Sequence, residues 1–239
     1  MLEGHEVVVL EFSGGKDSLA CLYFMREYWP RLIVLWVNTG DAFPETIKQM
    51  EGIKRLVPHF MEVKADQPAQ IAADGYPSDI VSIWDTPIGR QSYPGRQFRT
   101  QTAMACCCIN IWYPAAEAVK RLGATLVIRG QRRSESRLNQ MPSGAVESGV
   151  EYIFPIEGWT DTEVFEFLAK NGVALPESYA YVNTSLDCQH CTGYLDENAG
   201  KFAYMEQKHP KLNDVVKRRV IYLLQAANSE AKHLRAIVD

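Results

Sequence analysis

Short apolar runs alternate with amphipathic segments over the first 130 residues of the chain. The runs are rich in β-branched residues, as in strands buried on both faces of a parallel sheet. The sequence therefore predicts strands over residues 6–12, 32–37, 59–63 and 124–129, and helices over 19–26, 44–57 and 99–122. Pro44 suits the first turn of the second helix, Trp29-Pro30 ends the first, and Pro114 is expected to kink or divide the third.

The C-terminal part of the chain has a mainly helical pattern. A capping box, Thr160-x-x-Glu163, precedes apolar residues at helical spacing, and residues 197–208 and 211–236 are also predicted helices. Strands that alternate with helices predict the α/β class, with one mostly parallel, helix-flanked sheet. We expect a nucleotide-binding domain over residues 1–180, and over 181–239 a cysteine turn and a helical C-terminal extension packed on it.

Residues 66–98 show neither periodicity and are rich in proline and glycine. The sequence predicts a long functional loop here, and residues 74–98 are a candidate lid. Arg90, Arg96 and Arg99 give this segment a candidate local basic patch.

The composition is that of a globular protein rather than a disordered, collagen-like or coiled-coil chain. Lys and Arg number 25 and Asp and Glu 29, a net charge of −4, and 46% of residues are hydrophobic. The acidic balance argues against an autonomous nucleic-acid binder, so contact with DNA would need a partner or a local patch. The apolar runs are shorter than the ~20 residues of a membrane span, and residues 1–12 lack the pattern of a secretory signal. We expect a cytoplasmic protein without membrane contact. The sequence leaves its oligomeric state open, a homo-oligomer included.

A glycine-containing loop lies between the first predicted strand and the first helix: Ser13-Gly14-Gly15-Lys16-Asp17-Ser18. Backbone N–H groups and the helix dipole gather an anion at such a position, and glycine lets the backbone approach phosphate oxygens. Ser13, Ser18 and Lys16 can bind phosphate, whereas Asp17 is expected to orient Mg²⁺ or the loop itself. The spacing is not that of a Walker A loop, and a plain glycine turn with a helix cap is the alternative.

This loop resembles the signature of the PP-loop (adenine nucleotide α-hydrolase) superfamily, whose members cleave ATP between the α- and β-phosphates. The residues after the second strand, Asn38-Thr39-Gly40 followed by Phe43-Pro44-Glu45-Thr46, resemble the branch of the phosphoadenylyl-sulfate (PAPS) and adenylyl-sulfate (APS) reductases. That branch also holds the small subunit of ATP sulfurylase and the sulfur-transfer enzyme of DNA phosphorothioation. The resemblance spans roughly residues 6–195 and implies that the loop, Asn38, Thr39, Gly40 and Gly130 bind an adenine nucleotide.

The segment from Gly130 to Arg137 resembles the third motif of this branch. Arg132, Arg133 and Arg137 follow a strand end, where open α/β sheets bind ligands, and guanidinium groups match phosphate or sulfate. We expect Lys16 and these three arginines to be the catalytic groups. A solvated basic loop is the alternative for each arginine.

Five of the six cysteines form two clusters, Cys106-Cys107-Cys108 and Cys188-x-x-Cys191. A cysteine pair and a C-x-x-C about eighty residues later resemble the 4Fe–4S motif of APS reductases and iron–sulfur PAPS-reductase relatives. Since the family has a proline eight residues after the first cysteine, Pro114 implies Cys106 and Cys107, with Cys188 and Cys191, as ligands; Cys108 is the open alternative. A Zn²⁺ site and unligated thiols are the other interpretations. Cys21 is expected to be a small buried residue, and His190 an exposed turn residue rather than a ligand.

Two features depart from the reductase pattern. The reductases use a cysteine in a C-terminal tail, whereas the last cysteine here is Cys191, and Ile111 replaces a family lysine. We therefore expect an ATP pyrophosphatase or adenylyltransferase in sulfur metabolism or sulfur transfer, with Mg²⁺, a 4Fe–4S cluster, and sulfate or a sulfur-bearing acceptor. The alternatives are a sulfonucleotide reductase that uses an external thiol, and a nucleotide-binding subunit of a sulfur-transfer or DNA-modification assembly.

Overall fold

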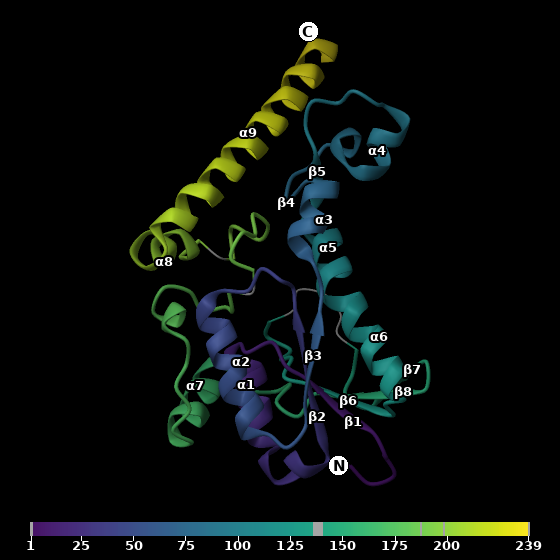
Figure 1. The fold of residues 1–239 in the computed structure, drawn as a ribbon, viewed down its shortest axis with the longest axis vertical. Helices are drawn as coiled ribbons and strands as arrows, with labels where there is room; N and C mark the ends of the chain where they lie inside the picture. Colours follow the sequence, from purple (N-terminus) through teal and green to yellow (C-terminus); the bar gives the residue numbers. More distant parts are fainter. Residues whose placement is uncertain (1, 136–140, 187, 198, 239) are drawn as a thin grey trace.

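The central feature of the computed structural model, which describes residues 2–135, 141–186, 188–197 and 199–238, is a twisted sheet (Figure 1). Within these residues the sheet has the strand order β3-β2-β1-β6-β8-β7, and β4 pairs with β5 in a second, small sheet. The strands are β1 (Val8–Glu11), β2 (Leu32–Asn38), β3 (Phe60–Lys64), β4 (Tyr76–Ser78), β5 (Thr100–Thr102), β6 (Leu126–Arg129), β7 (Ala145–Glu147) and β8 (Val150–Ile153).

The helices of the described chain lie between and beyond these strands. They are α1 (Lys16–Phe24), α2 (Pro44–Leu56), α3 (Gln67–Asp74), α4 (Pro87–Ser92), α5 (Ala103–Cys107), α6 (Tyr113–Leu122), α7 (Asp161–Lys170), α8 (Lys201–Lys208) and α9 (Pro210–Val238). Short 3-10 turns follow α1 and precede α4 and α8, and a π-helical turn, Cys108–Trp112, joins α5 to α6.

The sheet is parallel except at one edge. Val8 of β1 is in register with Leu32 of β2 on one side and with Leu126 of β6 on the other. Only the pair of β7 with β8 is antiparallel among the described strands. Because β1 is central and all its neighbours run in its direction, the carboxyl ends of β1, β2 and β6 meet at one edge, where doubly wound sheets bind ligands.

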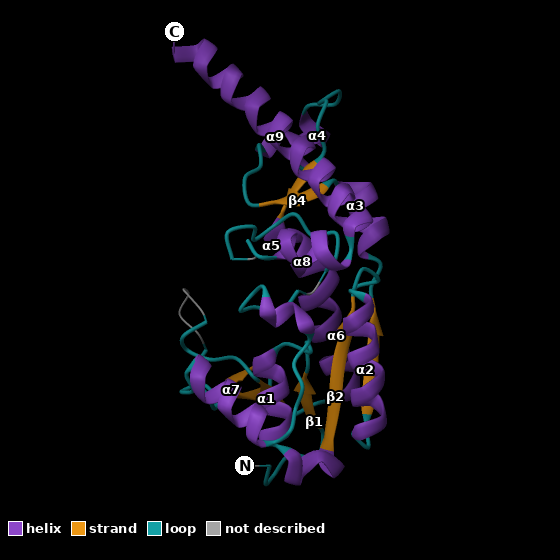
Figure 2. Ribbon diagram, turned by 90° about the vertical axis from the view of Figure 1, so that its left-hand side faces the viewer, coloured by secondary structure: helices purple, strands orange, loops and turns teal. Residues whose placement is uncertain are grey.

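Helices cover both faces of the sheet. Val8 and Leu10 pack with α1, α2 and α7 on one face, whereas Val9 and Val127 pack with α6 on the other. This alternation follows from the period of two along a strand. Figure 2 shows α1 and α7 together beside the strands, and a second group of elements beyond the carboxyl end of the sheet. The predicted fold class is thereby confirmed.

The second group of elements corrects the sequence analysis. Residues 66–98 do not form one long loop, because they contain α3, β4 and α4. With β5, α5 and the C-terminal part of α9 they form an upper lobe (Figure 1), in which the ring of Tyr222 packs on Tyr76 and Phe98. These short elements gain their stability from tertiary contacts, which hydrophobic periodicity does not show.

The arginines of this lobe bind acceptors within it rather than forming a free basic patch. Arg96 pairs with Asp85 at 2.8 Å and with Glu230 of α9 at 3.0 Å. Arg90 donates to the Asp74 carbonyl and Arg99 to the Ala73 carbonyl. These contacts join separate segments of the lobe, and contact of this patch with nucleic acid stays a prediction.

Other predicted elements need smaller corrections. The helix expected over residues 99–122 is divided into α5, the π-helical turn and α6, and Pro114 lies in the first turn of α6. The hairpin of β7 and β8 was not expected, since its strands are only three and four residues long. The predicted capping box of α7 is confirmed, as is the burial of Cys21, whose thiol has a pKa raised by burial to about 12.

The C-terminal helices attach through a separate small core. Phe43, which precedes α2, packs with Val182, Tyr204 of α8 and Val216 of α9. The boundary at residue 180 between domain and extension stays a prediction. Along the described part of the chain, each helix is too short or too polar to cross a membrane.

Leu126 offers a test of the central sheet. Its side chain on β6 is fully buried under α1 and α7. We expect Leu126→Ala to lower the free energy of unfolding by about 2–5 kcal/mol, because the cavity left behind adds to the lost burial. Leu56→Ala, the same change at a side chain that is 42% exposed, should cost less than about 1 kcal/mol in the same urea titration. Equal losses would contradict the assignment of β6 to the core.

Candidate functional site

A cavity of about 670 Å³ opens at the carboxyl ends of β1, β2 and β6. The glycine loop supplies Ser13, Gly15, Asp17 and Ser18 to its wall. Further lining comes from Thr39 after β2, from Gly130 and Glu135 after β6, from Ile111 and Trp112 of the π-helical turn, and from Tyr179, Thr184 and Ser185. The structure therefore brings the first, second and third sequence motifs to one site.

The glycine loop is held by hydroxyl groups. Gly14 has a φ of 86°, a conformation that favours glycine, and its N–H donates to Ser18 Oγ at 3.0 Å. The Gly15 N–H donates to Ser13 Oγ at 3.3 Å, and the Lys16 N–H donates to the Tyr179 hydroxyl at 2.7 Å. These N–H groups lie at the start of α1, the position where phosphate loops bind anions, and are bound by hydroxyl groups of the protein.

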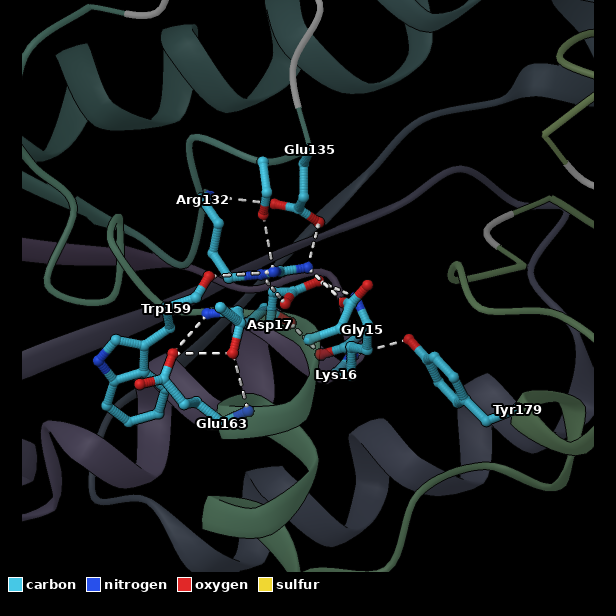
Figure 3. Close-up of polar contacts among 12 residues, drawn as sticks. Gly15, Lys16, Asp17, Arg132, Glu135, Trp159, Glu163 and Tyr179 are labelled. Atoms are coloured by element: carbon cyan, nitrogen blue, oxygen red, sulfur yellow. Dashed lines mark hydrogen bonds and ion pairs between the residues drawn. The ribbon is translucent and has the colours of Figure 1, made fainter.

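An ion cluster joins the start of α1 to the segment after β6 and to the first residue of α7 (Figure 3). Asp17 accepts from Arg132 Nε at 2.6 Å and from Lys16 Nζ at 2.7 Å. Arg132 also binds Asp161 at 2.7 Å, and Lys16 lies 3.1 Å from the same carboxylate. The side chains of Lys16 and Arg132 are only 4% and 2% exposed, so their charges depend on these carboxylates.

This cluster refines the predicted roles of its members. Both carboxylate oxygens of Asp17 bind cations of the protein, which favours the loop-orienting role over a role as a metal ligand. Lys16 and Arg132 are not among the described residues that line the cavity. Direct contact of either cation with a phosphate stays a prediction.

Glu135 is a carboxyl group of the cavity wall whose pKa is strongly raised. Burial, together with a hydrogen bond to Asp17 and its negative charge, raises the pKa of Glu135 from 4.5 to about 7. Burial acts on Asp161 in the same direction, but the hydrogen bonds and charges of Lys16 and Arg132 lower the pKa of that carboxyl. The Glu135 carboxyl therefore titrates close to neutral pH, next to the loop.

The remaining predicted residues of the second and third motifs have different surroundings. Asn38 donates to Glu62 at 2.7 Å and accepts from the Gly40 N–H at 3.0 Å, so it shapes the turn after β2. Arg133 is largely exposed and pairs with Glu157 at 3.0 Å, away from the cavity lining. Arg137 lies outside the described residues.

The cysteines predicted as metal ligands lie beside the cavity. Cys106 accepts from Gln67 Nε2 at 3.2 Å, and Cys188 Sγ lies 3.6 Å from the hydroxyl of Thr39 on the cavity wall. Burial raises the pKa of Cys106, and the charge of Cys191 acts in the same direction. Burial also raises the pKa of Tyr194, whose hydroxyl contacts Cys107. The fold thus returns the C-x-x-C turn to the helix that carries Cys106 and Cys107.

These four thiols have the chemistry that a soft metal or an iron–sulfur cluster takes. Within the described ranges, no three His, Cys, Asp or Glu side chains already converge as a finished metal site. The ligand set Cys106, Cys107, Cys188 and Cys191 stays a prediction. Cys108, the open alternative, is exposed.

A buried carboxylate anchors the C-x-x-C turn. Asp41 is 4% exposed and accepts from the His190 N–H at 3.0 Å and from the His190 ring at 2.6 Å. Gln189 N–H donates to the Asp41 carbonyl at 2.8 Å, and Ala42 forms a β-bridge with Cys188. The expectation that His190 is an exposed turn residue was wrong, because its side chain is 26% exposed and bound to Asp41.

Several residues of the site gave no sequence signal. Tyr179 lies in the 3-10 turn Glu177–Ala180, and Thr184 and Ser185 follow in an irregular segment. The Tyr179 hydroxyl and the side chain of Ser185 both lie near the glycine loop. Glu11 and Arg129, at the ends of β1 and β6, form a bidentate ion pair at 2.7 and 3.1 Å on the cavity wall. That pair has one partner on each strand, so only a comparison of strand ends could have shown it.

The parallel sheet, the glycine loop and the cavity at the strand ends together define an α/β protein whose fold is consistent with the PP-loop superfamily. The family model of the phosphoadenosine phosphosulfate reductase domain matches residues 7–194. The chain therefore belongs to this family.

Known proteins show how far the similarity reaches. A phosphoadenosine 5'-phosphosulfate reductase of Photorhabdus laumondii is 28% identical over 167 residues, and the chain spans 62% of that protein's length. A protein of Methanocaldococcus jannaschii is 25% identical over 221 residues, which are 87% of this chain and 47% of that one. The crystal structure of PAPS reductase from Candida auris, a phosphate complex, has a TM-score of 0.55 and 21% identity, covering 77% of this chain and 82% of that chain.

Gly130 tests the close contact between the third motif and the glycine loop. A Cβ atom at this position would lie 2.5 Å from the Asp17 carbonyl oxygen. We expect Gly130→Ala to lower the free energy of unfolding by about 1–3 kcal/mol and to weaken nucleotide binding, because the loop backbone must shift. Gly158→Ala, where no atom lies within 4 Å, is the matched control. Unfolding and binding titrations that rank the two variants equally would contradict this contact.

Glu135 predicts a pH-dependent stability. Its folded-state pKa of about 7 exceeds its ordinary value of 4.5, so the folded state holds the proton more tightly. Stability should fall as the pH rises through this window, by on the order of 1 kcal/mol after discounting for solvent exposure. Chemical denaturation from pH 4.5 to 8, without divalent cations, should show this slope in the wild type and a flatter profile in Glu135→Gln. Parallel profiles would refute the assignment.

Proposed function

We propose that the protein is an enzyme that binds ATP with Mg²⁺ and transfers or cleaves at the α-phosphate, releasing pyrophosphate, in sulfur metabolism or sulfur transfer. The glycine loop at the start of α1 and the cavity beside it support nucleotide binding. Membership of the reductase family supports sulfur chemistry.

The charge of the cavity wall is the observation that favours ATP over a sulfonucleotide. Among the described lining residues, the charged side chains are Glu11, Asp17, Arg129 and Glu135. Arg129 is already paired with Glu11. A wall with this excess of carboxylates favours a nucleotide that arrives with a divalent cation. Asp17 is held by Lys16 and Arg132. Glu135 accepts from the Arg132 N–H at 3.0 Å and lies 3.9 Å from its guanidinium, a weaker hold, and it is the residue we assign to Mg²⁺.

The chain's own groups suit transfer at the α-phosphate. The N–H groups of Gly14 and Gly15 and the hydroxyls of Ser13 and Ser18 would hold the leaving pyrophosphate, since serine hydroxyls can rotate from their present partners to an anion. Lys16 and Arg132, oriented by Asp17, would stabilise charge that develops at the phosphorus. A nucleotide held in this way would have its α-phosphate next to the acceptor side of the cavity.

The acceptor side faces the cysteines. Thr39 lines the cavity and contacts Cys188, so a sulfate or sulfur-bearing acceptor bound beside Thr39 would lie near both the nucleotide and the cysteines. Cys106, Cys107, Cys188 and Cys191 would hold the 4Fe–4S cluster. When bound, such a cluster supplies electron transfer and a local electrostatic field.

A sulfonucleotide reductase that uses an external thiol is the second candidate. The family match over residues 7–194 and the fold similarity to a PAPS reductase favour it. In that case the cavity would take APS or PAPS, and an external thiol would carry out the reduction.

One experiment separates these functions. Protein reconstituted without oxygen is incubated with α-labelled ATP, Mg²⁺ and candidate acceptors, and pyrophosphate and labelled products are measured. We expect pyrophosphate release, reduced at least about tenfold by Ser13→Ala and unchanged by Ser92→Ala on exposed α4. Sulfite formed from APS or PAPS with reduced thioredoxin, without pyrophosphate release from ATP, would favour the reductase. Tight ATP binding without turnover, restored by a partner, would identify a binding subunit.

A further inference from the structure

The C-terminal end of α9 projects beyond the rest of the molecule. Both ribbon views show its last turns extending past the upper lobe, and no side chain from residue 231 to 238 is buried (Figure 1, Figure 2). The turns before this end are held to the lobe by Tyr222, which packs on Tyr76, and by Glu230, which binds Arg96 at 3.0 Å. Beyond Glu230 the described part of the chain leaves the helix uncovered.

This end of α9 carries apolar side chains in a regular row. The row consists of Leu224, Ala227, Ala231, Leu234 and Val238. The spacings alternate between three and four residues, which gives the period of 3.5 that is typical of a helix packed against another helix. Leu224, Leu234 and Val238 are 57%, 56% and 86% exposed. The row therefore fits a second α-helix better than a strand or a loop.

The exposed apolar surface is concentrated at this end of the molecule. Among the described residues, ten of the seventeen exposed large hydrophobic side chains lie in residues 80–93 of the lobe and 221–238 of α9. Each leaves on the order of 100 Å² uncovered, so the five on α9 alone expose roughly 500 Å², about the largest apolar patch usual for a monomer. Two copies of this surface would bury about 1,000 Å², the lower limit of a stable interface, and the lobe can add to it.

The row is complementary to itself. Leu224 and Val238 lie seven residues on either side of Ala231, and the small side chain at this midpoint lets two helices approach closely. In an antiparallel pair with its two-fold axis at Ala231, Leu224 of each copy would meet Val238 of the other, and Leu234 would lie beside the small Ala227. Opposed helix dipoles also favour this direction. Self-complementarity is what a two-fold interface requires, whereas a bilayer surface is a poorer fit because the row contains no Trp or Phe.

We propose that α9 is a dimerisation helix, which pairs antiparallel with α9 of a second copy of this chain through the row from Leu224 to Val238. The inference goes beyond the proposed function and does not depend on it. Lys232 and Arg235 are exposed and lie outside the row, so the contact between the two helices contains no charged side chain.

The test is sedimentation equilibrium of the full chain over a concentration series. We expect a reversible dimer, which Leu234→Glu weakens at least about 100-fold because each dimer would bury two carboxylates in the row. Leu56→Glu, the same change at an exposed leucine at the end of α2, is the matched control and should associate as the wild type does. Because both leucines are exposed, both variants should fold, which circular dichroism verifies.

A wild type that stays monomeric up to its solubility limit would overturn the proposal, as would a Leu234→Glu dimer of wild-type strength. Monomeric wild type that binds anionic phospholipid vesicles, with binding lost in Leu234→Glu, would assign this face to a membrane and overturn the proposal in the same way.

Disulfide cross-linking tests the direction of the two helices. Ala231→Cys should cross-link two copies under mild oxidation, because the two-fold axis brings both copies of this position together, whereas Val238→Cys should not, since it faces Leu224. Wild-type protein oxidised in parallel gives the background of the native cysteines, among them the exposed Cys108. Cross-linking of both variants would show a parallel pair and overturn the antiparallel arrangement, and cross-linking of neither would overturn the row as the interface.

Discussion

The carboxylate of Asp17 is the point on which the site depends. Lys16 at the start of α1 and Arg132 after β6 both bind this carboxylate. The same two cations also bind Asp161 at the start of α7, so three separate segments are joined. Two nearly buried cations are stable only because these carboxylates accompany them, and the carboxylates in turn stay close together only because of the cations. The glycine loop therefore takes its shape from long-range ion pairs as much as from its two glycines.

The parts of the fold that could be predicted are those in which local pattern and tertiary burial agree. The apolar runs at residues 6–12 and 32–37 and the capping box at Thr160 each encode their structure within a few residues, and the structure contains each of them. The upper lobe could not be predicted in this way. Its α3 and α4 are only eight and six residues long, and α9 contacts the lobe through Tyr222 on Tyr76 and Glu230 on Arg96, pairs separated by more than a hundred positions.

The candidate site shows the same division. The glycine loop and the clustered cysteines are sequence-local, and their residues could be named before the fold was known. Tyr179 and Asp41 act on those motifs from distant segments, through one hydroxyl and one carboxylate. Arg133 shows the opposite case. The motif places it next to Arg132 but does not tell which of the two side chains is buried and which pairs with Glu157 at the surface.

The turn after β2 connects the two chemical regions of the molecule. Thr39 lines the cavity and Asp41 anchors the C-x-x-C turn, and only Gly40 separates them. Two residues of backbone span at most about 7 Å, so one short turn supports both the cavity wall and the C-x-x-C turn. A change in the sequence of this turn would therefore reach the cavity and the cysteines together, although they belong to separate motifs.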